Sequence, residues 1–266
     1  MDKREDRFDR KIDRSRVRRK RSEDLDTVQA VVDKRTAIIL YGLISRGYLS
    51  GMKGVVASGK ESNVYWATLE EDGKERDLAV KVYRTSTLDF KHIWGYIEGD
   101  PRFTKVKKDT SSIMYAWAEK EFKNLKLADE VGVRVPKPVV CRSNVLVMEF
   151  IGENGVSAPR LKDIVIEEPE SVFGTVFDYV ITLYKKAKLV HGDLSEYNIL
   201  YWKNGPVIID VSQAVLLSHP LALDFLARDL KNILRYFSGL GVGVPSLEEA
   251  YKEVTGEELK WRQENL

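Results

Sequence analysis

The sequence predicts an α+β fold with two lobes, a strand-rich first lobe and a mainly helical second lobe. Short apolar runs with a two-residue alternation recur between residues 54 and 148, which favours an antiparallel sheet accompanied by one helix. Beyond residue 153, apolar residues fall mostly at helical spacing. With 266 residues, 43% of them hydrophobic and 32% charged, the chain is long enough to bury a substantial core.

The N-terminal segment differs from the rest of the chain in charge. Residues 1–21 hold 11 Lys/Arg and 5 Asp/Glu, a net charge of +6, whereas the whole chain carries +2. Because this segment has few large apolar residues, it cannot bury enough surface to offset the entropy of ordering, and we expect a flexible basic arm. Such arms often bind nucleic acid through its phosphates, and a solvated tail without function is the alternative.

Two amphipathic helices are expected after the arm, because apolar residues recur there at helical spacing up to Gly47. Further on, a stretch without a clear period separates the strands from the helix that begins near Ile113, and we expect it to be a flexible loop. In chain order the predicted segments are the basic flexible arm (1–23), the N-terminal helices (24–50), the strand-rich lobe (51–148, with the flexible loop over 84–112), the linker between lobes (149–152) and the helical lobe (153–266).

Cysteine content and hydropathy bear on the cellular compartment. Cys141 is the only cysteine, so no disulfide partner exists within the chain and a reducing compartment is favoured. No stretch reaches the roughly 18 to 20 apolar residues that span a bilayer, and the first residues are too charged for a secretory signal. We therefore expect a cytoplasmic protein without a membrane partner.

A small polar turn between two apolar strands is the first candidate binding site. The turn has small side chains that would let backbone N–H groups approach phosphates, and it keeps one of the three glycines usual in such loops. An ordinary hairpin would look much the same. The residues predicted to contact a nucleotide here are Ser58, Gly59, Lys60 and Ser62.

A lysine lies in the middle of the next apolar strand, over residues 78–83. Burying Lys81 would be costly unless its charge is used, and Ala79 beside it would leave space for an adenine ring, so we expect Lys81 to grip nucleotide phosphates. The alternative is an edge-strand lysine that prevents aggregation. The following helix offers Glu119 and Glu121 as ion-pair partners, and we choose Glu121 because it lies one turn before the apolar Leu125.

The segment 191–198, His-Gly-Asp-Leu-Ser-Glu-Tyr-Asn, has the spacing of a catalytic loop for phosphoryl transfer. Asp193 would take or orient the proton of the acceptor hydroxyl, and Asn198 would hold a magnesium ion. Asp210 ends a short apolar hairpin 12 residues after Asn198, where a second magnesium ligand is expected. A solvated turn is the alternative for the loop alone. In the linker, the backbone groups of Glu149 and Ile151 are expected to bond adenine.

These signals stand in the order found in kinases, and together they resemble the RIO-type atypical serine protein kinases over about residues 25 to 255. Leu194-Ser195-Glu196-Tyr197 resembles the first, archaeal-like branch of that family more than the second. The resemblance rests on five segments: 58–65 (Ser-Gly-Lys-Glu-Ser-Asn-Val-Tyr), 117–122 (Trp-Ala-Glu-Lys-Glu-Phe), 148–152 (Met-Glu-Phe-Ile-Gly), 189–198, and Ile209-Asp210.

The resemblance implies a bilobal protein-kinase-like fold and the use of ATP with Mg²⁺, with Mn²⁺ as an alternative metal. It also implies serine/threonine kinase activity with autophosphorylation, ATP hydrolysis and an aspartyl-phosphate intermediate at Asp210. Family membership further implies work in the maturation of the small ribosomal subunit, with the pre-ribosomal subunit or its RNA as a partner that the basic arm could contact.

Two departures from ordinary protein kinases have a physical meaning. Gly192 replaces the arginine that usually pairs with a phosphorylated activation segment, and Asp210-Val211-Ser212 replaces Asp-Phe-Gly. Only about ten residues separate Asp210 from the helix near Leu221, so the second lobe is reduced and lacks an activation segment. Without that platform, we expect ATP hydrolysis and autophosphorylation to be easier to detect than phosphorylation of generic peptides.

Two other classes of protein share part of this pattern. Small-molecule phosphotransferases acting on aminoglycosides or choline share His-Gly-Asp, the later asparagine and the Ile-Asp strand, but they usually carry a large helical insertion for the acceptor. An RNA- or ribosome-binding pseudokinase would use the basic arm and would not need the complete set of Lys81, Asp193, Asn198 and Asp210. The sequence does not identify the physiological substrate, the autophosphorylated residue or the oligomeric state.

Overall fold

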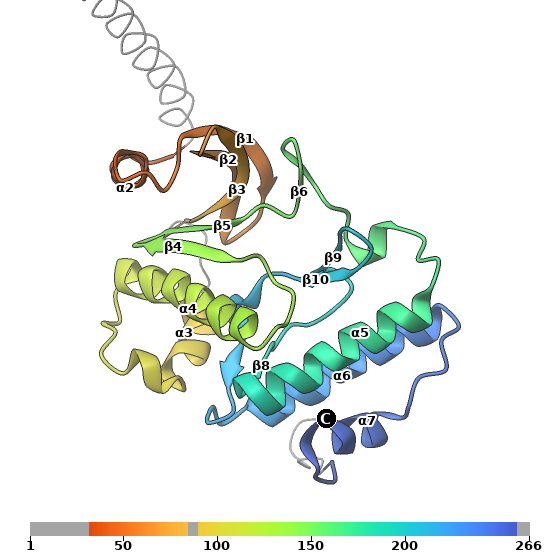
Figure 1. Cartoon of the computed structure of the whole chain (residues 1–266). Coiled ribbons are helices and arrows are strands. Elements are labelled where there is room, and N and C mark those ends of the chain that lie inside the picture. The colour runs from red at the N-terminus through yellow and green to blue at the C-terminus, as the bar shows by residue number, and fades with distance from the viewer. Residues whose placement is uncertain (1–31, 85–89, 260–266) are drawn as a thin grey trace, which may run out of the picture.

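A computed structural model describes residues 32–84 and 90–259, and it shows the predicted two-lobed α+β architecture (Figure 1). The first lobe is a five-stranded sheet in the order β1-β2-β3-β5-β4, and every neighbouring pair is antiparallel. The predicted fold class is therefore confirmed. The strands are β1 (Gly51–Ser58), β2 (Ser62–Glu71), β3 (Lys74–Tyr83), β4 (Pro138–Arg142) and β5 (Val145–Glu149).

The two faces of this sheet carry different side chains. On β3, Leu78 and Val80 point into a small apolar core that also contains α2 (Lys34–Ser45). Ala79 and Lys81 point to the opposite face, as the predicted alternation requires. That opposite face is covered by α4 (Thr110–Glu130), which packs on β4 and β5. The side of the sheet that carries Lys81 therefore faces α4 and the second lobe.

The N-terminal part of the chain is only partly described. Asp33 caps α2 by accepting hydrogen bonds from the backbone N–H groups of Arg35 and Thr36, and Leu40 and Leu43 bury one face of the helix. The predicted arm over 1–23 and the first of the two helices expected over 24–50 lie outside the described residues.

The flexible loop predicted over 84–112 is wrong for most of its length. It contains α3 (Phe90–Glu98), whose Ile93 and Ile97 are fully buried, and a 3-10 turn at Pro101–Phe103. The helix packs on α4, and Tyr96 stacks on Phe225 of the second lobe at 5.2 Å. Its burial comes from these distant partners, and Gly95 in its middle weakens the local helical signal.

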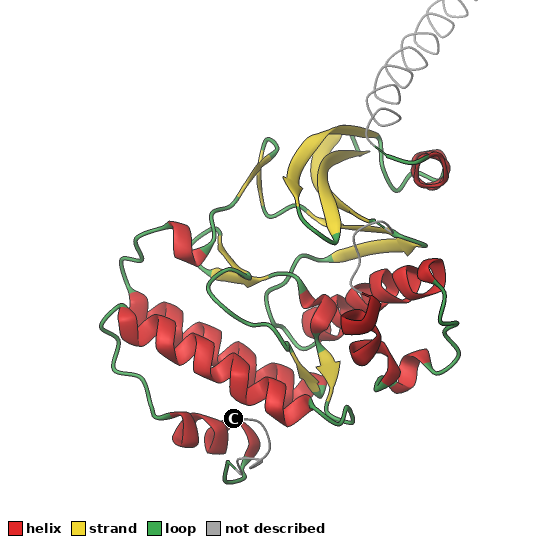
Figure 2. Ribbon diagram, turned by 180° about the vertical axis from the view of Figure 1, so that it is seen from behind, coloured by secondary structure: helices red, strands yellow, loops and turns green. Residues whose placement is uncertain are grey.

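The second lobe is mainly helical and has little sheet. Between the lobes, a small hairpin of β6 (Gly152–Glu153) and β7 (Val156–Ser157) follows the linker. Helices α5 and α6 run side by side, and α7 packs beneath the pair in both views (Figures 1 and 2). The remaining elements are α5 (Pro169–Thr182, continued by a π-helical turn Leu183–Ala187), β8 (Leu189–Val190), β9 (Ile199–Tyr201), β10 (Pro206–Ile208), β11 (Val215–Leu216), α6 (Ala222–Gly239) and α7 (Leu247–Thr255).

Short strand pairs hold the loops that contain the predicted catalytic residues. Strand β8 pairs with β11, and β9 pairs with β10, so residues 191–198 (from β8 to β9) and 209–214 (from β10 to β11) each run from one strand pair to the other. Between Asp210 and α6 the chain forms only a 3-10 turn (Val211–Gln213) and β11, so this fully described stretch contains no extended activation segment. None of the helices in the described ranges is long and apolar enough to cross a membrane.

Candidate active site between the lobes

A cavity of about 300 Å³ lies between the two lobes. It is lined by the β1–β2 turn, β3, the linker, the β9–β10 hairpin and Asp210. Of the eleven residues predicted to form the site, all but Lys60 and Asp193 line this cavity. A larger hollow of about 640 Å³ between α6 and α7 contains none of the eleven, so the smaller cavity is the candidate site.

One end of the cavity is suited to a flat apolar ring. Val64, Ala79 and Leu200 line it from the two lobes, and Glu149 and Ile151 border it in the linker. The N–H of Glu149 donates to the carbonyl of Lys137 (2.8 Å), and the carbonyl of Ile151 accepts from the N–H of Ala158 (2.9 Å). These bonds fix the backbone of the linker next to the cavity.

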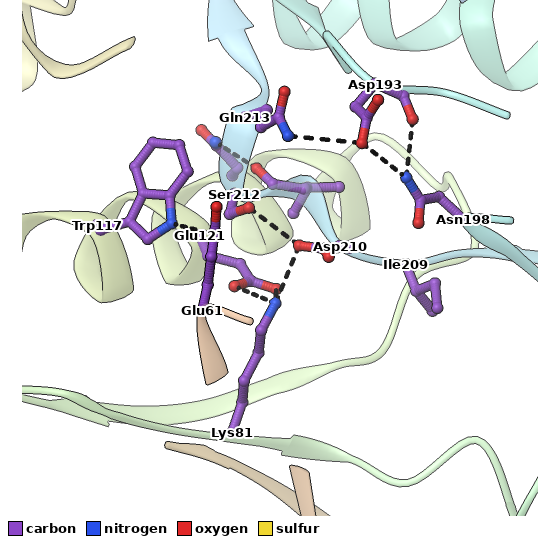
Figure 3. Close-up of polar contacts among 12 residues, drawn as sticks. Glu61, Lys81, Trp117, Glu121, Asp193, Asn198, Ile209, Asp210, Ser212 and Gln213 are labelled. Carbon is purple, nitrogen blue, oxygen red and sulfur yellow. Dashed lines mark hydrogen bonds and ion pairs between the residues drawn. The ribbon is translucent and has the colours of Figure 1, made fainter. Parts of the chain in front are cut away.

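A buried lysine joins two carboxylates at the other end of the cavity (Figure 3). Lys81 Nζ lies 2.9 Å from both Oε atoms of Glu121 and 2.9 Å from Oδ1 of Asp210. The side chain of Glu121 is 1% exposed, whereas that of Asp210 is 47% exposed because it opens into the cleft. The structure thus pairs Lys81 with Glu121, and Glu119 instead makes a surface ion pair with Lys123 (2.8 Å).

The charges of this cluster stabilise one another. Burial lowers the pKa of Lys81, but the carboxylates of Asp210 and Glu121 outweigh burial and raise that pKa above its usual value. Burial raises the pKa of Glu121 to about 7, and Lys81 offsets only part of this effect. Desolvation also acts to raise the pKa of Asp210, but Lys81 and Ser212 hold it below its usual value. Lys81 is therefore a fixed cation, and Asp210 is ionised at neutral pH.

The loop between β8 and β9 brings Asp193 and Asn198 together. Asn198 Nδ2 donates to the backbone carbonyl of Asp193 (2.8 Å) and to its Oδ2 (3.1 Å), and Gln213 Nε2 lies 3.5 Å from the same oxygen (Figure 3). These donors converge on Oδ2, which leaves Oδ1 as the oxygen that can take a proton from a reacting group.

A model of the RIO domain matches residues 63–250, which includes the Lys81 cluster and the whole loop. The chain belongs to the RIO family. It is 40% identical to the RIO-type serine/threonine-protein kinase Rio1 of Haloferax volcanii, over 95% of this chain and 85% of that protein. It is 45% identical to Rio1 of Methanocaldococcus jannaschii, over 91% of this chain and 81% of that protein. These relatives place it on the archaeal-like Rio1 branch.

Solved RIO structures have the same fold. The Rio2 kinase from Chaetomium thermophilum, in a complex with ADP/Mg²⁺-phosphoaspartate, aligns with a TM-score of 0.63 at 23% identity, covering 84% of this chain and 67% of that one. The same protein in another crystal structure gives a TM-score of 0.59 at 25% identity, covering 80% and 66%. The resemblance to a RIO kinase and the bilobal kinase-like fold, both predicted from sequence, are confirmed.

In this RIO kinase the predicted catalytic loop, residues 191–198, is held by side chains of α6. Asp229, 1% exposed, accepts hydrogen bonds from the N–H groups of Gly192 (2.7 Å) and Leu194 (2.8 Å), and Arg228 donates to the Gly192 carbonyl. His191 donates from Nε2 to the carbonyl of Ile209 (3.2 Å), because its Nδ1 accepts from a backbone N–H of the loop. Burial lowers the pKa of His191, so it is neutral there.

Gly192 does more than remove the charge of the arginine usual at this position, because the backbone geometry there also requires a glycine. Its φ is +80°, a conformation that side chains disfavour, and a Cβ at this position would lie 2.9 Å from the carbonyl oxygen of Gln213. The close approach joins the catalytic loop to the segment after Asp210. A larger residue at position 192 would force the two loops apart.

The predicted phosphate loop lies at the mouth of the cavity and is mostly exposed. Ser58, Gly59 and Lys60 are exposed, and Ser62 is 9% exposed. Two bonds shape the loop: the Gly59 N–H donates to the Ser62 carbonyl (2.9 Å), and Ser58 Oγ donates to Oδ1 of Asn63 (2.8 Å).

Asn198 and Asp210 have the donor atoms that Mg²⁺ prefers. The amide nitrogen of Asn198 is occupied by Asp193, which leaves the amide oxygen of Asn198 as a ligand. Oδ1 of Asp210 is occupied by Lys81 and Ser212, and Oδ2 is left. One amide oxygen and one carboxylate oxygen that line the same cavity fit a magnesium ion that completes its shell with water and phosphate oxygens.

Proposed function

We propose that this RIO kinase transfers the γ-phosphoryl group of ATP, as a serine/threonine kinase that phosphorylates itself, and hydrolyses ATP through an aspartyl-phosphate at Asp210. The observation that carries the proposal is the convergence of Lys81, Glu121, Asp210 and Asn198 on one cavity between the lobes, with Asp193 bonded to Asn198 beside it. Each of these groups has the chemistry that a phosphoryl-transfer site requires.

The binding roles follow from charge and position. The adenine would lie between Ala79 and Leu200, against the linker backbone at Glu149 and Ile151. Lys81, fixed by Glu121, would hold the α- and β-phosphates, and the backbone of the loop that contains Ser58, Gly59, Lys60 and Ser62 would cover the phosphates. A magnesium ion on Asn198 and Asp210 would neutralise charge that develops on the phosphates during transfer.

Transfer to a hydroxyl group would use Asp193. The acceptor oxygen attacks the γ-phosphorus, the bond from that phosphorus to the β–γ bridging oxygen breaks, and ADP leaves with the electron pair. Asp193 takes the proton of the hydroxyl on Oδ1, while Asn198 and Gln213 hold its Oδ2. The electron balance requires no further reactant.

Hydrolysis through Asp210 would use the same geometry in two steps. Oδ2 of Asp210 attacks the γ-phosphorus and displaces ADP, which leaves an acyl phosphate. Water then attacks that phosphorus, gives its proton to Asp193 and releases the carboxylate. Lys81 and Ser212 hold Oδ1, so Oδ2, which would also contact the magnesium ion, is the oxygen oriented for the attack. The solved Rio2 complex contains a phosphoaspartate, which supports this proposal for the present chain.

One experiment tests the chemistry directly. The full chain is incubated with γ-labelled ATP and Mg²⁺, released phosphate is measured, and labelled residues are mapped. Label that survives acid identifies a phosphorylated serine or threonine, and label removed by hydroxylamine identifies the aspartyl-phosphate. We expect Asp193→Ala to reduce transfer by about 10²- to 10⁴-fold, as loss of a general base does, while ATP still binds. Unchanged turnover in Asp193→Ala, or no turnover in the wild type, would overturn the proposed function.

We also propose that the protein acts in the cytoplasm on the maturing small ribosomal subunit, with the basic arm contacting its RNA. The charge of the arm, net +6 over residues 1–21, supports this partner. We expect deletion of residues 1–21 to weaken binding to ribosomal RNA and to flatten its salt dependence. Identical salt titrations with and without these residues would contradict the role of the arm.

A further inference from the structure

Two buried side chains of α4 hold the backbone of the 3-10 turn that follows the β9–β10 hairpin. Lys120 Nζ donates to the carbonyl oxygens of Ser212 (3.0 Å) and Ala214. Asn124 Nδ2 donates to those of Val211 (2.8 Å) and Ala214 (2.9 Å). Lys120 and Asn124 are both 0% exposed. Three carbonyl groups of one short segment are thus held by a single helix.

Polar side chains at these two positions are unexpected on packing grounds. They lie four residues apart on the same face of α4, between the buried Trp117 and Leu125. Burial lowers the pKa of Lys120 to about 7; Asp100 acts to raise it and Arg102 to lower it. An apolar side chain would fill this core without such desolvation. The hydrogen bonds to the turn are the feature that an apolar residue could not supply.

The orientation of the Asn124 amide is set by a further pair of buried groups. Arg102 Nη2 donates to Oδ1 of Asn124 (2.8 Å). The same Nη2 lies 2.6 Å from Oδ2 of Asp100, a residue that is 2% exposed. Because a guanidinium has only donors, the amide oxygen must face Arg102 and the amide nitrogen must face the turn. The direction of the Asn124 amide is therefore fixed, with its oxygen on Arg102 and its nitrogen on the turn.

The turn held in this way fixes Asp210. Asp210 has a left-handed backbone (φ 57°, ψ 58°), which residues other than glycine rarely adopt, and Ser212 Oγ donates to its Oδ1 (2.9 Å). Glu121, the neighbour of Lys120 on α4, holds Lys81. The same helix thus sets both the cation and the carboxylate of the site.

We propose that Lys120 and Asn124 are positioning residues for phosphoryl transfer, which hold Asp210 in its working orientation from α4 where this chain lacks an extended activation segment. The inference rests on the proposed function. A purely structural role would reduce the stability of the fold and leave the turnover of folded molecules unchanged. A positioning role reduces kcat while nucleotide binding without metal, which depends on Lys81 and the cavity walls, is retained.

The experiment compares Lys120→Met and Asn124→Leu with the wild type as full chains, well below their thermal midpoints. Lys120→Met keeps the approximate volume, Asn124→Leu keeps the branched shape, and both remove the donors. We measure kcat and KM for labelled ATP with Mg²⁺, and the affinity for a fluorescent ADP analogue in EDTA. We expect kcat to fall by about 10- to 100-fold, the scale at which misplaced catalytic groups act, and the ADP affinity to stay within about twofold.

A matched control separates stability from positioning. Leu43→Ala removes buried volume from the core on the opposite face of the sheet and should lower the thermal midpoint without changing kcat. Lys120→Arg, which keeps donors toward the carbonyls, should recover part of the lost kcat. If Lys120→Met does not fold, Asn124→Leu decides the question.

The possible results point to different conclusions. Lowered midpoints with wild-type kcat in the variants that fold would overturn the inference and leave the proposed function intact. A wild type that neither transfers nor releases phosphate would overturn the proposed function and, with it, the premise of the inference. A fall in kcat for the folded variants, with Leu43→Ala unaffected, supports the inference.

Discussion

The two surfaces that would grip the nucleotide phosphates are built in different ways. At the base of the cavity, Lys81 and Glu121 are buried and bond through charged side chains, together with Asp210 at the cleft surface. At its mouth, the β1–β2 turn is mostly exposed and is shaped by backbone bonds such as that from the Gly59 N–H to the Ser62 carbonyl (2.9 Å). The structure at the base of the cavity depends on the identity of its side chains, and the structure at the mouth depends on the path of its backbone.

This difference sets how the two surfaces should respond to substitution. A charge removed from a buried cluster leaves its partners without compensation in a medium of low dielectric constant, which is strongly destabilising. An exposed loop can exchange side chains with little effect, provided that its N–H groups keep their direction. Substitutions at the base of the cavity should therefore change stability and phosphoryl transfer together. Substitutions at its mouth should change mainly KM for ATP.

The largest effect is expected at the base, for Lys81→Met. The replacement leaves Glu121 buried beside Asp210 with no cation between them, so we expect the free energy of unfolding at pH 8 to fall by about 3 kcal/mol. Transfer from ATP should fall by about 10²- to 10³-fold, as it does when a preorganised electrostatic group is lost. Chemical denaturation and labelled-ATP assays measure the two effects.

The double variant Lys81→Met/Glu121→Gln isolates the cause of this instability. Because glutamine carries no charge, the double variant should regain most of the lost unfolding free energy while its transfer stays low. A double variant as unstable as Lys81→Met would show that lost packing, and not an uncompensated carboxylate, explains the change.

The parts of the site that the sequence predicted are those whose signal is local. Lys81 lies in a run of five apolar or small residues, where a charge is conspicuous, and Asp193 and Asn198 lie in one loop at a fixed spacing. The choice of Glu121 over Glu119 used only the position of a nearby core leucine, and the structure places Glu121 on Lys81. Strand alternation and helical spacing were likewise enough for the two-lobed fold.

The parts that the sequence did not predict depend on contacts between distant segments. Asp229 holds the catalytic loop across 35 or more residues, and in the sequence it is one of several charged residues of α6. Lys120 lies between Glu119 and Glu121, and these charged neighbours predict an exposed lysine, although Lys120 is fully buried. The sequence predicts a loop in place of α3, because the stacking of Tyr96 on Phe225 of α6 has no local signature.

A smaller effect is expected for the titration of Glu121. Burial raises its pKa to about 7 from 4.5, so the folded state binds the proton more tightly than the unfolded state. For an acid with a raised pKa, the stability linked to that proton increases as pH falls from about 7 toward 4.5. The unfolding free energy of the wild type relative to Glu121→Gln should therefore rise by about 1 kcal/mol per pH unit on acidification across this window.

Denaturation curves of both proteins at several pH values measure this difference, and the subtraction removes the titration of all other groups. A constant difference between pH 7.5 and pH 5 would show that Glu121 stays ionised in the folded protein. In that case the base of the cavity would be a fully charged cluster with no proton to gain.

The smallest effect is expected at the mouth, for Gly59→Ala. A Cβ on residue 59 would lie 3.3 Å from the carbonyl oxygen of Ser62, which also accepts the Gly59 N–H, so the turn must open by a few tenths of an ångström. We expect KM for ATP to rise about threefold with kcat within about twofold of the wild type, as an imperfect backbone contact with phosphate would cause. Gly54→Ala, on the same strand pair, is the matched control because a Cβ there meets nothing within 4 Å. A loss of kcat in Gly59→Ala as large as that in Lys81→Met would contradict the distinction between base and mouth, because the loop would then be as rigidly coupled to the chemistry as the buried lysine.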